Sequence, residues 1–444
     1  MSLQEIEKVF GHLNSLLMDQ LRGGEHLILQ LSGEETQFIR FNRARVRQTG
    51  TVSDANLTLK FIYNERTAYA TFPLRGDTEV DTANALENLD YLRKEVQQLP
   101  PDPYITLPQN QGSSHEVYEG KLLNPEKAVE FLLPPVEGLD FTGLYAGGKV
   151  IRANANSAGQ KHWFSTDSYF LDYSLIAPSE KAVKSIFAGS FWEQSEYEKQ
   201  IRESVDRLAR LDRDIYQIEP GKYRTYFAPA ATADLIGMLS WGAISESSLR
   251  QGGSALNKMR TGEKLSSLFS LKENFAGGNV PRFNDLGEMS ALELPLIVGG
   301  ELVNTLVSSR SAKEYGLQSN GASSGEGLRA PEVDGGTLTR ETILKTLDTG
   351  LYLSNLHYLN WSDQTGGRIT GMTRYACFWV ENGEIVAPIK DMRFDESLYS
   401  FLGDNLKSMT DFREFIPETG TYEQRSLGGS LMPGMLVEDF SFTL

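Results

Sequence analysis

The residue types that most often carry hydrolytic chemistry are few in this sequence, and they lie far apart. There are five histidines, at positions 12, 26, 115, 162 and 357. No two share the i, i+3 or i, i+4 spacing that places side chains on one helix face. The single cysteine, Cys377, lies beside Phe378 and Trp379, where a buried, inert thiol is the expected state. A catalytic site would have to gather distant positions, for example His357 with Cys377 and a carboxylate.

Two short motifs match hydrolase signatures by their letters but not by their context. His115-Glu116 begins like the His-Glu pair of a zinc-protease helix, but position 119 is Glu, so no second histidine follows at the spacing that holds a metal. Residues 321–325, Gly-Ala-Ser-Ser-Gly, match Gly-Xaa-Ser-Xaa-Gly, but no strand leads into them and no helix follows. We interpret the first motif as a solvated loop histidine and the second as a surface loop.

A basic ribbon is the clearest cluster of charged residues. Arg40, Arg43, Arg45 and Arg47 alternate with Phe41 and other less polar residues. If this segment is a strand, Arg43, Arg45 and Arg47 share one of its faces. The ribbon is then a solvated strand face, or a surface that contacts the carboxylates of a peptide or of a partner subunit. Nucleic-acid binding is the least favoured reading, because the whole chain is strongly acidic.

The elements that position these residues begin with an N-terminal α/β domain, which we place at residues 1–105. Apolar spacing predicts helices over residues 3–21 and 78–99. Alternating apolar and polar residues predict an antiparallel sheet between them. Its four strands are expected at residues 26–31, 36–46, 55–63 and 67–74.

Residues 106–220 are interpreted as a central strand-rich segment and linker, and residues 221–444 as a C-terminal domain. The stretch 100–120 is rich in Pro, Gln, Ser and Gly, which is typical of a long loop. In the C-terminal domain we expect helices at 230–241 and 245–259, and many strands, including one over 292–309. Asn382-Gly383 predicts a hairpin. The fold class is therefore α+β, with a large, barrel-like, mostly antiparallel C-terminal sheet.

Composition narrows the class of protein further. The chain has 444 residues with 43 Lys and Arg against 59 Asp and Glu, a net charge of −16, which disfavours nucleic-acid and membrane-surface partners. One cysteine excludes an internal disulfide and suits a reducing compartment. The first five residues carry no positive region and lead into no apolar stretch, so we expect no signal peptide, and no apolar run is long enough to span a membrane. We expect a soluble, cytoplasmic, multidomain protein.

Three segments together resemble the TldD/PmbA family, whose members were once labelled modulators of DNA gyrase. They are residues 38–48 (FIRFNRARVRQ), residues 150–159 (VIRANANSAG) and residues 369–394, which run from ITGMTR through FWVENGEI to RF. Each motif is loose, but their order extends over nearly the whole chain. The resemblance implies a cytoplasmic protease of two homologous subunits that acts on unfolded peptides.

The resemblance also implies which subunit this is. In TldD-type subunits, a His-Glu-Xaa-Xaa-Xaa-His helix and a later Cys hold zinc. The matching helix here, Ala231–Trp241, contains neither His nor Glu. The chain is therefore similar to the TldE/PmbA-type subunit, with no metal ligand, catalytic residue or cofactor of its own.

We expect a non-catalytic subunit that forms a heterodimer with a zinc-bearing TldD-like homologue and holds an unfolded peptide. A homodimer is possible in isolation. Candidates for contact with the peptide or the partner are Arg43, Arg45, Arg47, Asn154 and Asn156. Two alternatives stay open: an active metallopeptidase with atypical ligands, and a homodimeric peptide-binding scaffold.

Overall fold

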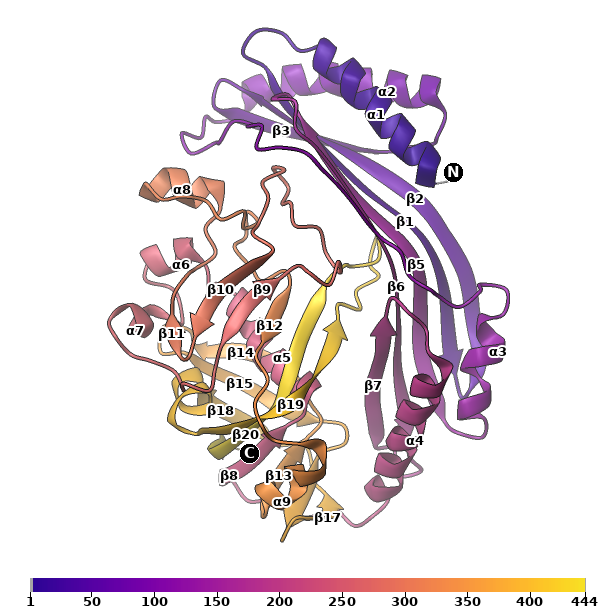
Figure 1. Ribbon diagram of the computed structural model, residues 1–444, viewed down its shortest axis with the longest axis vertical. Helices are drawn as coiled ribbons and strands as arrows, with labels where there is room; N and C mark the ends of the chain where they lie inside the picture. Colours follow the sequence, from indigo (N-terminus) through magenta and orange to yellow (C-terminus); the bar gives the residue numbers. More distant parts are fainter. Residues whose placement is uncertain (1–2, 444) are drawn as a thin grey trace.

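Two β-sheets organise the computed structural model, which describes residues 3–443 (Figure 1). The N-terminal sheet has seven strands, in the order β3-β2-β1-β5-β6-β4, with β7 also paired to β6. All of its pairs are antiparallel except β4 with β6. The strands are β1 His26–Asn42, β2 Arg45–Tyr63, β3 Arg66–Pro73, β4 Ser114–Tyr118, β5 Phe141–Asn156, β6 Lys161–Ile176 and β7 Ala182–Gly189.

The β1–β2 hairpin is longer than the sequence suggests. The two strands expected at 26–31 and 36–46 form one strand, β1, and the turn that ends it is made by Arg43 and Ala44, both with φ of 50°. Arg43 therefore lies in a turn, and the prediction that it shares a strand face with Arg45 and Arg47 is wrong. Residues 33–35, Gly-Glu-Glu, fall between the two expected strands, but they are paired to both β2 and β5.

The central segment contributes strands to this same sheet. β5 pairs with β1 over its whole length, and β4, inside the expected loop 100–120, pairs with β6. His115 therefore lies on a strand and not in a loop; its Nε2 atom is 3.0 Å from Glu7 Oε1. Residues on both sides of position 105 thus build one continuous sheet.

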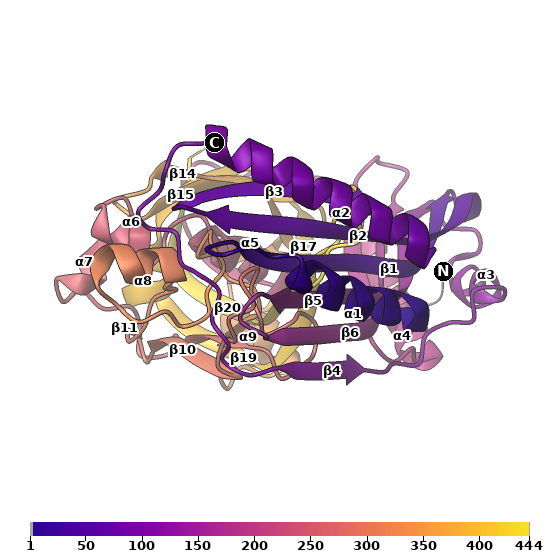
Figure 2. The same ribbon diagram turned by 90° about the horizontal axis from the view of Figure 1, so that it is seen from above.

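Helices cover the two ends of the N-terminal sheet. α1 Leu3–Asp19 and α2 Thr78–Glu95 lie across one face (Figure 2), where Phe10 and Leu13 pack with Leu59 of β2. α2 begins at Asp77, whose carboxylate accepts the N–H groups of residues 79 and 80, a favourable helix N-cap. At the other end, α3 Ala128–Leu132 and α4 Gln194–Leu211 cover a second core that also contains Ile39 and Tyr173.

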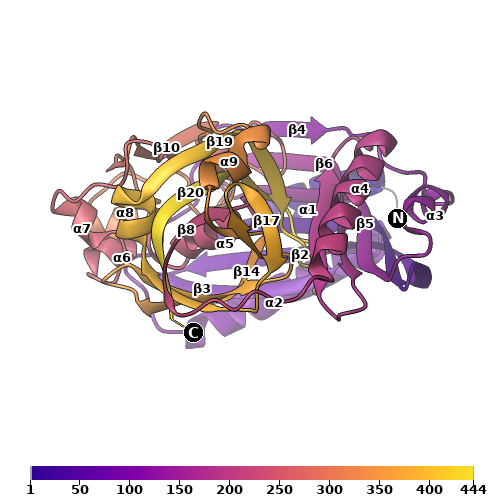
Figure 3. The same cartoon turned by 90° about the horizontal axis from the view of Figure 1, so that it is seen from below.

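The C-terminal sheet has thirteen strands, mostly antiparallel, and curls around helix α5 Pro229–Gly237, one face of which is buried (Figure 3). The expected barrel-like sheet is confirmed; β11 and β17 end its main path, so it does not close. Its strands are β8 Gly221–Phe227, β9 Leu271–Asn274, β10 Glu293–Val298, β11 Glu301–Leu302, β12 Pro331–Val333, β13 Gly350–Leu353, β14 Asn355–Asp363, β15 Arg368–Arg374, β16 Phe378–Glu381, β17 Glu384–Pro388, β18 Arg393–Ser397, β19 Leu406–Pro417 and β20 Gly429–Phe442.

The helices of this region are short. They are α5 Pro229–Gly237, α6 Glu246–Arg250, α7 Asn257–Arg260, α8 Ser309–Tyr315 and α9 Ile343–Leu347. Single 3-10 or π turns also occur along the chain: η1 Val96–Gln98, η2 Pro134–Val136, η3 Met238–Ser240, η4 Arg340–Thr342 and η5 Ser400–Asp404. Among residues 3–443, no helix is long and apolar enough to cross a membrane.

Glycines explain two predictions that are wrong and one that is confirmed. The single helix expected at 245–259 is wrong, because Gly252 adopts a φ of 77° and separates α6 from α7. The strand expected at 292–309 is likewise interrupted at Gly299-Gly300, both with positive φ. The hairpin at Asn382-Gly383 is confirmed: φ values of 52° and 78° are those of a type I′ turn.

A buried arginine joins the two sheets. Arg425, in the segment between β19 and β20, is 2% exposed and inserts its guanidinium into the N-terminal sheet. It donates to the carbonyl oxygens of Ser168 (2.7 Å) and Gly148 (2.8 Å), and its backbone N–H donates to the Glu34 carboxylate (3.0 Å). Burial lowers the pKa of Arg425 to about 10, so it stays charged at neutral pH.

A second contact lies near the other end of the sheet. Asn154 and Gln30 both donate side-chain N–H groups to the Asp285 carbonyl oxygen, at 3.0 and 2.7 Å. His162 lies 3.0 Å from the Gly287 carbonyl oxygen and stacks on Phe283 at 5.2 Å between ring centroids. The loop that connects β9 to β10 is thereby fixed to β1, β5 and β6.

Replacing Arg425 with methionine should destabilise the whole protein. The buried carbonyl groups of Ser168 and Gly148 would lose their charged donor. The Glu34 carboxylate would keep its bond from the backbone N–H of residue 425 but lose the positive charge beside it. The loss of a buried, hydrogen-bonded charge costs about 3–5 kcal/mol. Urea unfolding measures the change, and Arg368→Met, at an exposed ion pair with Asp395, is the control, expected to cost under about 1 kcal/mol. Equal effects of the two variants would show that Arg425 does not hold the sheets together.

Candidate functional site

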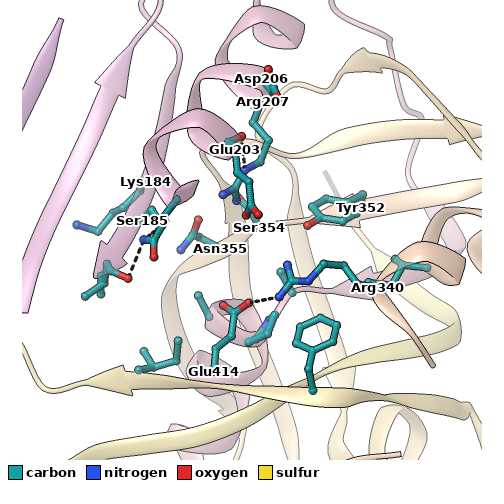
Figure 4. Close-up of a pocket in the computed structure, with 18 of the residues that line it drawn as sticks. Lys184, Ser185, Glu203, Asp206, Arg207, Arg340, Tyr352, Ser354, Asn355 and Glu414 are labelled. Carbon is teal, nitrogen blue, oxygen red and sulfur yellow. Dashed lines mark hydrogen bonds and ion pairs between the residues drawn. The ribbon is translucent and has the colours of Figure 1, made fainter. Parts of the chain in front are cut away.

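A cavity of about 610 Å³ lies between the N-terminal sheet and the C-terminal sheet (Figure 4). One wall is formed by β7 and α4. The facing wall is formed by the start of α5, the junction of β13 and β14, and residues of η4 and β19. The cavity therefore contains side chains from both halves of the chain, and the joint at Arg425 fixes their relative positions.

The first turn of α5 supplies backbone donors to this cavity. Ala228 precedes the helix and provides no side-chain cap, and Pro229 occupies the first helical position, where its missing N–H costs nothing. The first helical bond runs from Thr232 N–H to the Ala228 carbonyl oxygen. The N–H groups of Ala230 and Ala231 are therefore left without intrahelical acceptors, as at any helix start.

Ser354 and Asn355 lie beside this helix start. The Leu353 carbonyl oxygen accepts the Ala228 N–H at 2.9 Å, which places the end of β13 against the first turn of α5. Ser354 is 4% exposed, and in the part of the chain that the structure describes its hydroxyl has no hydrogen-bond partner. The side-chain oxygen of Asn355 is also buried and unpartnered there. Both residues line the cavity.

Two arginines extend into the same space. Arg207 of α4 donates through Nε to the backbone oxygen of Glu203 at 3.3 Å, and its guanidinium forms no ion pair within residues 3–443. Arg340 pairs with Glu414 at 3.2 Å and lies 4.1 Å over the Phe412 ring. In Figure 4, Ser354 and Asn355 lie between these two arginines.

The β7 wall has the properties of a sheet edge. β7 pairs with β6 on one side, and residues 184–188 line the cavity. The Gln200 side chain donates to the Ile186 carbonyl oxygen at 3.0 Å, so part of this edge already bonds to a side chain. The remaining backbone groups can pair with an extended segment.

Asp234, on the exposed face of α5, has a strongly shifted pKa. Its side chain reaches solvent, but protein surrounds it on most sides, and this burial raises its pKa to about 7. The Leu356 N–H, 3.1 Å from Oδ2, opposes the shift. Near neutral pH the carboxyl group is thus partly protonated, a property often found at functional sites.

The side chains around α5 do not fit zinc. Its less buried face carries Ala230, Ala233, Asp234 and Gly237, of which Asp234 alone offers a ligand atom. Within residues 3–443 there is no group of three His, Cys, Asp or Glu side chains that could hold a metal.

The structure does not bring His357 and Cys377 into one site. Burial raises the pKa of the Cys377 thiol to about 11, and its sulfur lies 3.2 Å from the Arg374 carbonyl oxygen, so the thiolate needed for metal binding or nucleophilic attack is disfavoured. His357 is exposed on β14, and the centroid of its ring lies 4.0 Å from that of Tyr358, with the two rings tilted by 43°.

The five residues selected from the sequence fall in two separate places. Arg43, Arg45 and Arg47 lie exposed at the tip of the β1–β2 hairpin. Asn154 and Asn156 are buried on β5, where their amide groups donate to the carbonyl oxygens of Asp285 and Gln109. The structure therefore does not gather them into one site.

Sequence reasoning missed Arg207, Asp234 and Ser354. The only indication of this site in the sequence was Pro229, because proline is common at the first position of a helix.

Comparison with known proteins identifies the class to which this fold belongs. Residues 220–444 match the family described as the PmbA/TldA metallopeptidase C-terminal domain. Because the match covers half of the chain, the protein belongs to the PmbA/TldD metallopeptidase family.

Curated relatives and solved structures agree with this assignment. The chain is 32% identical over 145 residues to the metalloprotease PmbA of Escherichia coli O157:H7, covering 32% of this chain and 29% of that protein. It is 25% identical over 325 residues to the metalloprotease PmbA homolog of Haemophilus influenzae, covering 66% of each. The chain thus spans less than two thirds of the length of either relative.

Two solved structures share the whole fold. TldE from Thermococcus kodakarensis superposes with a TM-score of 0.79 at 15% identity, covering 98% of this chain and 100% of that one. A putative modulator of DNA gyrase from Thermotoga maritima gives 0.76 at 17% identity, covering 99% and 100%.

Asp234→Asn should stabilise the protein at alkaline but not at acidic pH. The folded-state pKa of Asp234 lies above the ordinary value of 3.8, so ionisation opposes folding. The stability that the neutral carboxyl group contributes to the folded state is fully present below about pH 4. It is lost as the pH rises through about 7. Asparagine cannot ionise, so the variant should melt at a higher temperature than the wild type at pH 8, and at the same temperature near pH 4.

Thermal unfolding at the two pH values measures this difference. Asp214→Asn, at an exposed position after α4, is the control and should show no such pH-dependent gain. An Asp234→Asn variant that is no more stable than the wild type at pH 8 would contradict the enclosed environment of this carboxyl group.

Proposed function

We propose that this chain is a non-catalytic, TldE/PmbA-like subunit that holds peptides for a zinc-bearing homologue in a heteromeric metallopeptidase. One observation carries the proposal: in a family described as metallopeptidase, the accessible face of α5 offers a single carboxylate, Asp234, where hydrolysis through zinc requires three protein ligands. We expect no cofactor in this chain and zinc in the partner. Its single cysteine suits the cytoplasm as the compartment.

The cavity supports the peptide-holding role. Strand addition along β7 would bind the main chain of an extended peptide, which gives affinity without dependence on sequence. Unfolded substrates of varied sequence require this kind of binding. The apolar residues Phe187 and Phe378 that also line the cavity would accept side chains of the peptide.

Contact with the partner has a separate candidate surface. Arg43, Arg45 and Arg47 lie at an exposed hairpin tip on the opposite side of β1 from β5. In a chain with a net charge of −16, this basic cluster would favour an acidic surface on a homologue. A homodimer formed through the same tip would place like charges together.

Mixing experiments test which of the two subunits supplies the peptidase activity. The isolated chain should not cleave an unfolded peptide, and activity should appear only when a zinc-bearing homologue is added. His357→Ala and Cys377→Ala should leave turnover of the mixture within about threefold of the wild type, a barrier change under about 1 kcal/mol. Zinc content, measured on each separated subunit, should be found in the homologue.

The opposite result would favour the active-enzyme alternative. If the isolated chain cleaved the peptide and His357→Ala abolished cleavage, a catalytic site would exist in this chain.

A further inference from the structure

Some hydrogen-bonding groups that line the cavity beside α5 have no partner within residues 3–443. The hydroxyl of Ser354 is buried and has no partner among residues 3–443, which costs free energy unless a ligand or water satisfies it. Next to it, the first turn of α5 directs free N–H groups and the positive end of the helix dipole toward the same space. These two features are independent of each other: the N–H groups need an acceptor, and the hydroxyl can donate to one.

The charged side chains nearby favour an acceptor that is negative. Arg207 has no ion-pair partner within residues 3–443, so its terminal N–H groups remain available for a ligand. Arg340 lies on the other side and is held in place by Glu414 and the Phe412 ring. Arginine presents parallel N–H groups in the geometry that a carboxylate accepts.

Carboxylates also line the cavity and limit where an anion can bind. Glu414 is neutralised by Arg340, and Asp206 is exposed on α4. Glu203 is on α4 one turn before Arg207. An anion is therefore best accommodated on the side of Ser354 and the helix start, in the space between Arg207 and Arg340 (Figure 4).

We propose that Ser354, the first turn of α5 and Arg207 form a subsite for a carboxylate group of the bound peptide. The proposal deepens the peptide-holding function and rests on it. The carboxylate comes from the peptide C-terminus or from an acidic side chain. A subsite for the C-terminus would anchor one end of an extended peptide, and pairing along β7 would then fix its direction.

Binding of labelled peptides to the isolated full-length chain tests the subsite. Three versions of one unstructured peptide are compared by fluorescence anisotropy: a free C-terminal acid without acidic side chains, its C-terminal amide, and the amide with one internal aspartate. If the subsite binds the C-terminus, the free acid should bind at least tenfold more tightly than both amides. If it binds an acidic side chain, the aspartate peptide should regain the affinity.

Variants connect the preference to these residues. Ser354→Ala and Arg207→Gln should each reduce the preference for the carboxylate about tenfold and leave binding of the plain amide unchanged. Arg202→Gln is the matched control, since Arg202 lies on the exposed side of α4 and does not line the cavity. Raising the salt concentration should weaken the acid peptide more than the amide.

The outcomes separate this proposal from the function on which it rests. Equal affinity for the three peptides, or a preference that survives both substitutions, overturns the subsite but leaves peptide holding intact. Absence of binding by every peptide overturns the subsite and also the peptide-holding function of the chain.

Discussion

The arrangement of the two sheets depends on a buried cation, Arg425, at one of the contacts between them. A guanidinium group inside protein is tolerated only when its charge is met by acceptors, and Arg425 finds them in the backbones of two neighbouring strands, β5 and β6. One of these backbone acceptors belongs to Gly148. Residue 148 must be glycine, because a Cβ there would lie 2.0 Å from the Glu35 carbonyl oxygen of β1. The glycine is thus required by the pairing of β1 with β5, and its carbonyl group then accepts from Arg425.

Fixing the two sheets also determines the shape of the space between them. With Arg425 at one contact and the Asp285 carbonyl group at another, the C-terminal sheet cannot slide along β1 without breaking these hydrogen bonds. β7 and α4 are consequently held opposite α5. The cavity is thus a property of the joint between the two sheets, and a change in either contact would be transmitted to Ser354 and Arg207 without touching them.

Some of this organisation could be predicted from local patterns and some could not. The apolar spacing of α2, the alternation along β2 and the Asn382-Gly383 turn are local signals, and each predicted the right element. Residues 33–35 lie outside the expected strands, because Glu34 is buried against the backbone of Arg425, 391 residues later in the chain, and no local pattern indicates that contact. Likewise, no local pattern could indicate that Ser354 lies beside the first turn of α5, since only the pairing of β8 with β13 brings them together.

The β1–β2 hairpin has a consequence for behaviour in concentrated solution. β3 pairs with residues 56–63 of β2, so residues 45–51 of that strand pair only with β1 within the described structure, and all of them are exposed. Such an edge is a template for unwanted growth of the sheet from one molecule to the next. Arg45 and Arg47 on this segment oppose that process, because two identical copies would bring the same positive charges together. The positive charges at the hairpin tip thus disfavour aggregation through this strand edge.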